Sequence, residues 1–554
     1  MKNRYNALLA AAMLSFASCS SVDLDPTAQY DVAYAMSSEA NANLYVNYFY
    51  QVIAQWGQFG SCALGGANSN MSDGLTDILK YGGIVSGTGD CNLIMTVSGQ
   101  QSVTRNYFDS WTSGYSWIRR FNEALKYLDM YKANFSGDQY SRIKAEILFF
   151  RAHVEFMMMR SHASVKDGLG IILYDTLDEM SIATKDTERN TLEQCWDAIE
   201  RDARFAIEHL PEPATAAGRV HRYAAAALLA RAMLYAERYD KALEAVKTVE
   251  DSNLYGYLDD YDSIFKSVDN SEVIWGFAYA SGTLTHSFDL NYSMPGDYCL
   301  SGSKGGGWAG PTQEFVDAFD RADGTPYTID GDRFITNENI GGRDPRLACC
   351  VLYNGAVWKD RPLECFEGGV DQKYMPYGSV NSPGNTVTGY YMRKLLDESN
   401  TDFQLNGSSQ CWPEYRYAEL ELIKAECLAH GGEYDQARQV LSDLRKVRFG
   451  REDVATAEIS SWDSALDAIL HERMIELCYE GHRFWDLRRT GRAKAVLDGR
   501  KYTGVLWRPS GSGFVAESVP ADMGAHRYPD NFDRFPLPQS EISNNTKAKQ
   551  NADW

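Results

Sequence analysis

The chain has 554 residues, with 75 acidic and 54 basic side chains and a formal net charge of −21 at pH 7. This negative balance argues against nucleic-acid binding, which needs clustered Lys and Arg to displace counterions. The length is sufficient for a large core and for more than one lobe.

The first eighteen residues have the pattern of a secretory signal. Lys2 and Arg4 precede an apolar run from Ala7 to Ala17, which is too short to span a bilayer. Small residues then precede Cys19, as they do at lipoprotein signal peptidase sites. We therefore predict a signal peptide over residues 1–18 and acylation of Cys19, which would anchor the protein to a membrane. An ordinary signal cleavage, with Cys19 incidental, is the alternative.

Helical periodicity dominates the next part of the chain. Apolar side chains recur at helical spacing from Trp111 to Tyr131 and from Arg142 to His162. Thr191 and Gln194 form a capping box that opens a further helix, and Pro211 follows its end.

Two distant segments then repeat one another. The run that begins at Ala230 resembles the run that begins at Ala425, and each contains a Tyr-Asp pair, at Tyr239 and Tyr434. Small residues let two helices approach closely, with the Tyr-Asp in the turn between them. We predict two tetratricopeptide-like helix pairs, which serve as scaffolds and partner surfaces.

The residues between these repeats form a loop-rich lobe. Gly, Asn, Ser, Tyr and Trp are frequent from Leu254 to Gln410, and helical periodicity is scarce. The run from Asp297 to Thr312 lacks the Gly-Lys-Ser/Thr of a phosphate-binding loop. We predict that it forms a surface platform with Trp308 at its tip, and a flexible loop is the alternative.

The most specific pattern lies between Glu472 and Arg489. Read as one helix, the region from Leu466 to Phe484 carries an apolar stripe that contains Gly481, where a glycine admits a close neighbour. Charged residues follow at steps of three and four, which predicts a structural ladder of ion pairs on the same helix. The ladder consists of Arg473, Glu476, Glu480 and Arg483.

This run, ERMIELCYEGHRFWDLRRTG, resembles the C-terminal signature of the RagB/SusD family. Members are surface lipoproteins of Bacteroidetes that capture nutrients, mostly glycans, for a TonB-dependent outer-membrane transporter. The segments Gly310–Phe319, Arg534–Ile542 and Gln550–Trp554 are also similar to the family. The tail departs from the family pattern at Leu537, Asn545 and Asp553.

The resemblance implies a mainly α fold, in which tetratricopeptide-like helix pairs form a scaffold beside a large loop-rich irregular lobe. It divides the chain into a signal peptide (1–18), an N-terminal helical region (19–253), a loop-rich insert (254–410) and a C-terminal region (411–554). It implies an oligosaccharide ligand, a TonB-dependent SusC-like porin as partner, and surface exposure on the outer membrane through the lipid at Cys19. We predict no catalytic residue, cofactor or metal ligand, and the negative charge argues against a nucleic-acid partner.

Glycan capture needs flat aromatic faces for sugar rings and short polar side chains for their hydroxyl groups. Loops on a rigid scaffold are where such residues tend to lie. Each candidate could instead pack in the core, as most aromatic residues of a large protein do. The candidates are Asn70, Asp73, Tyr81, Tyr298, Trp308 and Trp358.

Two other functions stay open. A glycoside hydrolase on a helical scaffold would need two carboxylates flanking the bond, and no motif singles out a pair among the 75 acids. His471 and Glu472 begin like a zinc-protease motif, but Ile475 stands where the second His is required. A peptide-capturing member of the same family is the other alternative.

Overall fold

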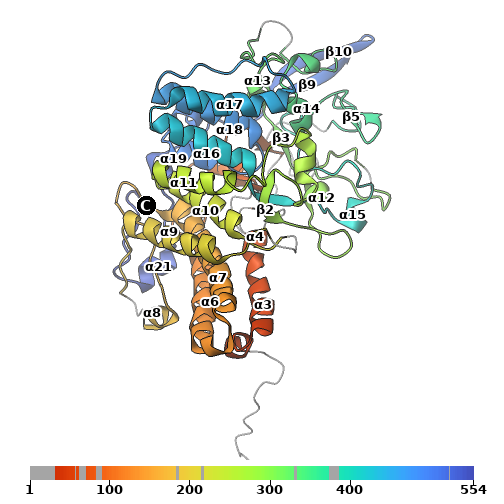
Figure 1. Cartoon of the computed structure of the whole chain (residues 1–554). Coiled ribbons are helices and arrows are strands. Elements are labelled where there is room, and N and C mark those ends of the chain that lie inside the picture. The colour runs from red at the N-terminus through yellow and green to blue at the C-terminus, as the bar shows by residue number, and fades with distance from the viewer. Residues whose placement is uncertain are drawn as a thin grey trace, which may run out of the picture.

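The computed structural model describes residues 31–55, 58–60, 70–82, 90–182, 186–213, 218–297, 299–329, 333–372, 386–522 and 524–554. Stacked helices form one part of the molecule, and short strands, short helices and irregular segments form the other (Figure 1). The predicted mainly α fold with helix pairs and a loop-rich lobe is confirmed. Across the described ranges, no helix combines the length and the apolar character needed to cross a membrane.

Side-chain caps determine where the N-terminal helices begin. α7 (Gly137–His162) starts after Ser136, which forms a reciprocal capping box with Gln139, so it begins before the Arg142 that periodicity predicted. α9 (Leu192–His209) begins at the predicted capping box. The other helices of this region are α2 (Val32–Ala35), α3 (Glu39–Asn47), α4 (Gln51–Gln55), α5 (Asp90–Thr96), α6 (Trp111–Met130) and α8 (Leu177–Ile182).

Two helix pairs follow the predicted repeat. They are α10 (Arg222–Tyr235) with α11 (Tyr239–Glu250), and α16 (Tyr417–His430) with α17 (Tyr434–Phe449). Because α11 also packs on α16, two pairs that are far apart in sequence form one stack (Figure 1). Buried alanines in α10 and α16 permit this close packing. Tyr239 and Tyr434 each begin a helix, so the prediction that they lie in the turn is wrong.

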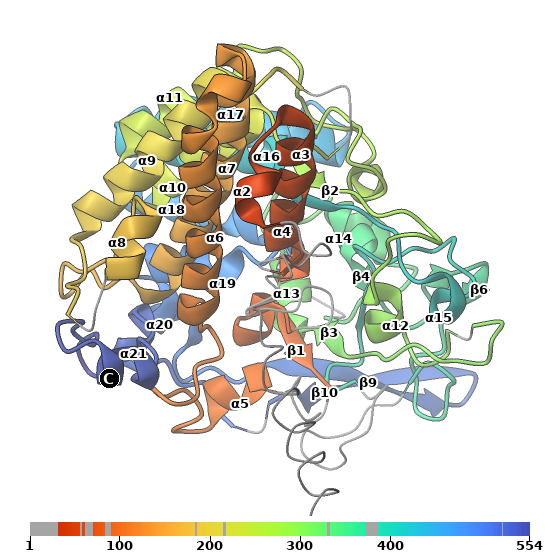
Figure 2. The ribbon, with the colours of Figure 1, turned by 90° about the horizontal axis from the view of Figure 1, so that it is seen from below.

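Paired short strands connect the lobe to the helices. β2 (Val273–Phe277) pairs antiparallel with β8 (Trp412–Arg416), which brings the two ends of the lobe together. β1 (Leu79–Tyr81) pairs antiparallel with β3 (Ala309–Pro311), so a segment that precedes the long helices becomes part of the lobe. Figure 2 shows α12, α14 and α15 on the side of the molecule away from α9.

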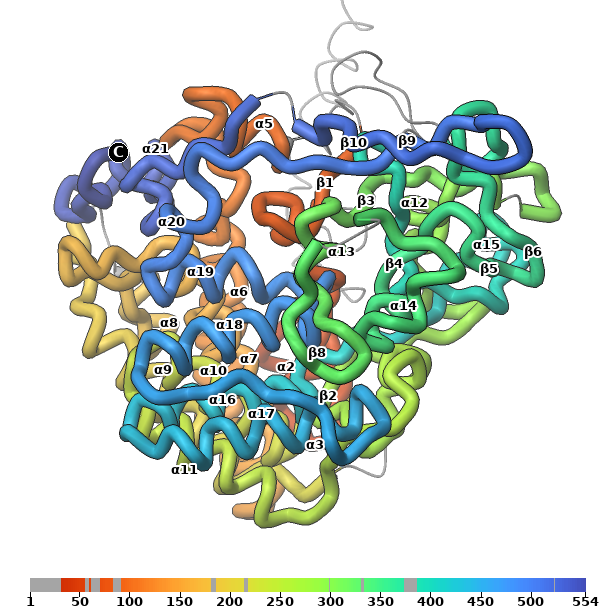
Figure 3. The backbone as a smooth tube through the Cα atoms, turned by 90° about the horizontal axis from the view of Figure 1, so that it is seen from above, coloured from red at the N-terminus to blue at the C-terminus, as the bar shows by residue number. Residues whose placement is uncertain are grey.

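The remaining elements are short, apart from a hairpin, β9–β10, that runs along one edge of the molecule (Figure 3). Those of the lobe are α12 (Phe288–Tyr292), α13 (Gln313–Ala318), α14 (Arg346–Cys350), β4 (Val351–Leu352), β5 (Val357–Trp358), β6 (Arg361–Pro362), β7 (Tyr391–Met392) and α15 (Phe403–Asn406). Those of the C-terminal region are α18 (Trp462–Glu476), α19 (Arg483–Arg489), α20 (Ala493–Leu497), β9 (Thr503–Ser510), β10 (Gly513–Pro520) and α21 (Gln539–Asn544).

The region from Leu466 to Phe484 is not one helix. α18 ends at Glu476, and Tyr479 and Gly481 have left-handed φ angles of 64° and 78° before α19 begins. These angles break the helix and correct the prediction of a continuous apolar stripe. The predicted close neighbour of Gly481 is present, because a Cβ on this residue would lie 2.6 Å from Gly60 Cα.

The predicted ladder of ion pairs on one helix is also wrong, because the turn rotates its members toward different partners. Arg473 Nε pairs with Asp486, 2.7 Å away, and Arg483 Nη2 pairs with Asp77, 2.8 Å away. Glu476 and Glu480 instead join a buried network of charges from several elements. Their basic partners are Arg346, Lys394, Arg416 and Arg448.

Candidate functional site

The β1–β3 pair brings two of the predicted ligand residues together. The amide of Gly82, next to Tyr81, donates to the carbonyl oxygen of Trp308 over 2.7 Å. The Tyr81 hydroxyl accepts from the Met71 amide over 2.6 Å and lies 2.8 Å from the Tyr292 hydroxyl. Tyr81 is buried, so its contacts fix the backbone behind Trp308.

Trp308 is half-buried, and its ring meets Tyr292 edge-on, with centroids 5.9 Å apart. The preceding glycines are needed for packing: a Cβ on Gly305 would lie 2.3 Å from Ser293 O, and one on Gly306 would lie 2.6 Å from Asn291 O. The prediction that Trp308 stands at a free loop tip is therefore corrected. It is a partly exposed ring on a segment that backbone hydrogen bonds hold against α12.

The two polar candidates near Tyr81 are both buried. Asp73 accepts a hydrogen bond from the Tyr479 amide over 2.7 Å, and burial raises the pKa of its carboxyl to about 7. Its other oxygen, Oδ1, has no hydrogen-bond partner among the described residues. Asn70 is buried beside Met71. The Asn70 and Asp73 side chains therefore support the segment that contains them from the core side.

Trp358 lies apart from this group, on β5. Its ring is buried, and its indole nitrogen donates to Asp297 over 3.2 Å. Lys359 Nζ also pairs with Asp297, 2.9 Å away. The residue lines a cavity of 690 Å³ with charged residues of both signs. Tyr298 and Cys19, the other predicted site residues, lie outside the described residues.

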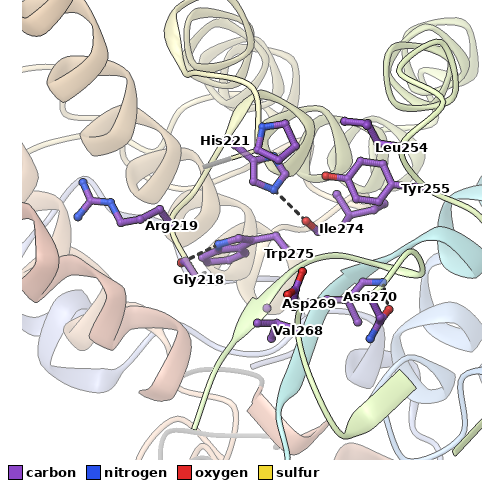
Figure 4. A pocket seen from close by; sticks show the side chains of 13 residues that line it. Gly218, Arg219, His221, Leu254, Tyr255, Val268, Asp269, Asn270, Ile274 and Trp275 are labelled. Carbon is purple, nitrogen blue, oxygen red and sulfur yellow. Dashed lines mark hydrogen bonds between the residues drawn. The ribbon is translucent and has the colours of Figure 1, made fainter. Parts of the chain in front are cut away.

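A smaller cavity of 220 Å³ lies between the turn before α10 and β2. Figure 4 shows His221 and Trp275 on its wall, each tied to backbone. His221 Nε2 lies 2.9 Å from Ile274 O, and Trp275 Nε1 donates to Gly218 O over 3.0 Å. Burial lowers the pKa of His221 to about 4, so the imidazole is neutral near pH 7. These two hydrogen bonds hold the His221 and Trp275 side chains in the wall and occupy His221 Nε2 and the Trp275 indole nitrogen.

Within the described ranges, no group of three or more His, Cys, Asp or Glu is arranged to hold a metal ion. Cys427 precedes His430 by three residues and Cys478 precedes His482 by four, a spacing that metal ligands can have on a helix. Both cysteines are buried free thiols. Sequence reasoning missed Tyr292, the support of the Trp308 ring, because a five-residue helix carries no measurable periodicity. The partly exposed ring of Trp308 can present an apolar face to a ligand.

Comparisons with known proteins agree with the resemblance seen in the sequence. A profile described as the SusD family matches residues 271–554, and one described as starch-binding and associating with the outer membrane matches residues 76–234. SusD-like protein P25 of Formosa agariphila is 21% identical over 416 residues, which cover 73% of each protein. SusD-like protein P38 of the same organism is 34% identical over 101 residues, only 17% of this chain and 20% of that protein.

Solved structures match the whole fold. A SusD-like protein from Bacteroides fragilis has a TM-score of 0.74 at 24% identity, covering 94% of this chain and 98% of its own. Surface glycan-binding protein A from Bacteroides thetaiotaomicron has a TM-score of 0.65 at 20% identity, covering 94% of this chain and all of its own. A laminarin-binding SusD-like protein has a TM-score of 0.64 at 21% identity, with the same coverage.

Proposed function

Because this chain belongs to the SusD family, we propose that it binds an oligosaccharide at the cell surface and delivers it to a partner TonB-dependent transporter of the outer membrane. Two proteins with the same fold support a saccharide ligand, since one binds laminarin and the other is a surface glycan-binding protein. The protein acts by binding, without catalysis.

The observation that carries the proposal within this chain is the Trp308 ring. It is partly exposed, lies on a segment fixed by backbone hydrogen bonds, and is supported at its edge by Tyr292. A preorganised aromatic face loses little conformational freedom when a sugar ring stacks on it. The pairing of β1, which contains Tyr81, with β3 supports the segment from the core side.

A glycan panel tests the binding function. The purified protein should retain an oligosaccharide and release it unchanged, because binding without catalysis leaves the glycosidic bonds intact. Shortened chains would instead indicate the glycoside hydrolase, and retention of peptides alone would indicate a peptide-capturing protein. Both results would contradict the proposal.

A second experiment tests the anchor and the partner. We propose that Cys19 is acylated and attaches the protein to the outer membrane, as the signal pattern predicts. Cys19→Ala should abolish labelling with a fatty-acid probe and release the protein from the membrane fraction. Affinity purification of the anchored protein should recover a TonB-dependent porin. Equal labelling of Cys19→Ala and native protein, or purification without a porin, would contradict these assignments.

A further inference from the structure

A third cavity, of 610 Å³, lies at the ends of several helices, away from Trp308. Its wall includes the end of α7, the start of α9, the α10–α11 turn, the start of α18 and the end of α19. Figure 3 shows α18 and α19 side by side in this region. We call it the arginine pocket, because Arg160, Arg488, Arg489 and Arg534 line it.

Two of these arginines are neutralised by carboxylates. Arg489 donates to both oxygens of Glu426, 2.6 and 2.8 Å away, and also pairs with Asp486. Arg534 pairs with Asp553, which also pairs with Lys166 over 2.7 Å. These two arginines therefore have carboxylate partners, although Asp553 is shared with Lys166, a further cation that lines the pocket.

Arg160 and Arg488 differ from them. Neither has a carboxylate within 4.0 Å among the residues that the structure describes, and the Nε atom of each lacks a hydrogen-bond partner there. Arg160 does have a side-chain hydrogen bond with Tyr235. Both guanidinium groups lie over the Trp485 ring, with 4.2 and 5.3 Å between the guanidinium carbons and the ring centroid. Arg488 donates to two carbonyl oxygens at the end of α7, those of Arg160 and Ser161.

The electrostatic environment of this pair is unfavourable for two cations. Burial and the charge of Arg160 lower the pKa of Arg488 to about 10, and burial also lowers the pKa of Arg160. Arginine side chains stay protonated in proteins, and a buried positive charge without a carboxylate partner is costly. Asp533 and Glu237 also line the pocket, and Asp533 acts to raise the pKa of Arg488. Because neither carboxylate lies within 4.0 Å of Arg160 or Arg488, these two guanidinium groups still provide a local site for an anion.

Aromatic side chains line the same pocket. Tyr239 stacks on His430 with centroids 3.9 Å apart, and Trp462 meets both rings edge-on. Tyr239 and Trp462 are half-buried and His430 is exposed, so part of this cluster is open to a ligand. Guanidinium groups and flat aromatic faces together suit a ring that carries an anionic group.

We propose that the arginine pocket is a second binding site, which takes the carboxylate or sulfate ester of an acidic saccharide through Arg160 and Arg488. The choice of a saccharide as carrier rests on the proposed function, whereas the anion site rests on the two arginines alone. The site is separate from the Trp308 surface, so each can be tested without the other.

Isothermal titration of the full folded chain tests the proposal. The probes are a uronic acid disaccharide, the neutral disaccharide of the same linkage, and inorganic sulfate. We expect the uronate and the sulfate to bind, the neutral sugar to be excluded from this site, and binding to weaken as salt is added. Arg160→Gln should weaken uronate binding about tenfold or more, because it removes charge-assisted hydrogen bonds.

Matched variants separate this site from the first. Arg204→Gln on α9 removes an arginine that already pairs with Glu200 and Glu244, and it should leave uronate binding unchanged. Trp308→Ala should also leave it unchanged while weakening neutral glycan binding. Equal binding of the uronic and neutral sugars, sulfate binding without uronate binding, or full uronate affinity in Arg160→Gln would each overturn the proposal. If the native protein binds the uronate but no neutral glycan, that result would count against the proposed function and not against the anion site.

Discussion

Glu476 shows how much charge the interior of this protein accommodates. Its carboxylate is fully buried and accepts hydrogen bonds from Arg346, Arg416 and Arg448, at 2.8 to 2.9 Å. Glu480, four residues on, accepts from Lys394 and Arg416. A buried charge is tolerated when it is paired and hydrogen-bonded, but removing one partner leaves the others uncompensated. The network therefore holds α18 against the lobe and β8.

Glu480→Ala should destabilise the fold by roughly 3–5 kcal/mol, because Lys394 and part of Arg416 lose their buried partner. Protein that remains folded should keep its ligand affinity, since the network does not reach the Trp308 face. Calorimetry and ligand titration measure the two effects. The control is Asp453→Ala, which removes an exposed ion pair with Arg451 and should change little. Lost affinity with unchanged stability would place Glu480 in a binding site.

The same carboxylates should make stability depend on pH. The pKa of Glu476 lies well below its usual range, and those of Glu472 and Glu480 are also lowered, through their arginine and lysine partners that outweigh burial. Their stabilisation is present above the unfolded pKa of about 4.3 and is lost as pH falls through the lower folded values. Urea unfolding at several acidic pH values should show a weaker pH dependence in Glu480→Gln than in the native protein. Parallel curves would mean that Glu480 is not a source of the effect.

Trp308→Ala should weaken glycan binding by roughly 1–2 kcal/mol, the loss expected for one aromatic face. Because the ring is half-buried against Tyr292, a modest fall in melting temperature should accompany the loss of affinity. Titration of the folded variant with the oligosaccharide, beside a melting curve, measures both. Trp308→Phe, which keeps an aromatic face, should retain more of the affinity. Unchanged affinity in Trp308→Ala would make it a packing residue only.

At the scale of elements, periodicity located α6, whereas local capping signals set the starts of α7 and α9. The capping box at Thr191 and Gln194 located the start of α9, because both hydrogen bonds form within four residues. The apolar stripe through Gly481 was misleading, since nothing local shows that Tyr479 adopts a left-handed conformation. That conformation depends on tertiary contacts, including the bond from the Tyr479 amide to Asp73, which is distant in sequence.

Gly481→Ala tests this turn. The residue has a φ of 78°, and a Cβ would meet the Gly60 backbone at 2.6 Å, so strain and a clash add together. Gly432→Ala is a matched control, because Gly432 has a φ of 83° with no atom within 4 Å of its Cβ position. Denaturant unfolding should show a loss of about 1 kcal/mol for Gly432→Ala, from backbone strain alone. Gly481→Ala should lose more stability than Gly432→Ala, because the clash with Gly60 adds to the strain. An equal loss would mean that the turn can move away from the Gly60 backbone.

At the scale of the whole molecule, the sequence predicted the lobe and several site candidates but not their arrangement. Tyr81 and Trp308 come together because β1 pairs with β3, a contact between segments more than two hundred residues apart. Residue type identified the side chains, whereas their burial depends on contacts that are distant in sequence, such as that of Asp73 with the Tyr479 amide. Trp358 lies elsewhere because β5 pairs with β6, within a local hairpin.

The last residues tie the C-terminal region to the helical scaffold. Asn551 Nδ2 donates to the carbonyl oxygen of His162, the last residue of α7, over 2.9 Å. It also donates to the carbonyl oxygen of Phe535 over 2.7 Å. Arg189 donates to Asn551 Oδ1 over 2.7 Å, and the Trp554 ring stacks on Phe532 with centroids 6.3 Å apart. These contacts satisfy buried polar groups that would otherwise lack partners.

Deletion of residues 547–554 should therefore destabilise the fold, because it exposes the Phe532 face and leaves the His162 carbonyl and Arg189 without the Asn551 amide. Asn551→Ala alone should cost about 1–3 kcal/mol, the penalty for leaving buried polar groups unsatisfied. Lys547→Ala, at an exposed position in the same segment, is the control and should leave the melting curve unchanged. Thermal unfolding of the three proteins measures the series. If the deletion has the melting temperature of the native protein, the tail contributes nothing to stability. If the deletion is destabilised but Asn551→Ala is not, the other contacts of the tail carry the effect, such as the packing of Trp554 on Phe532.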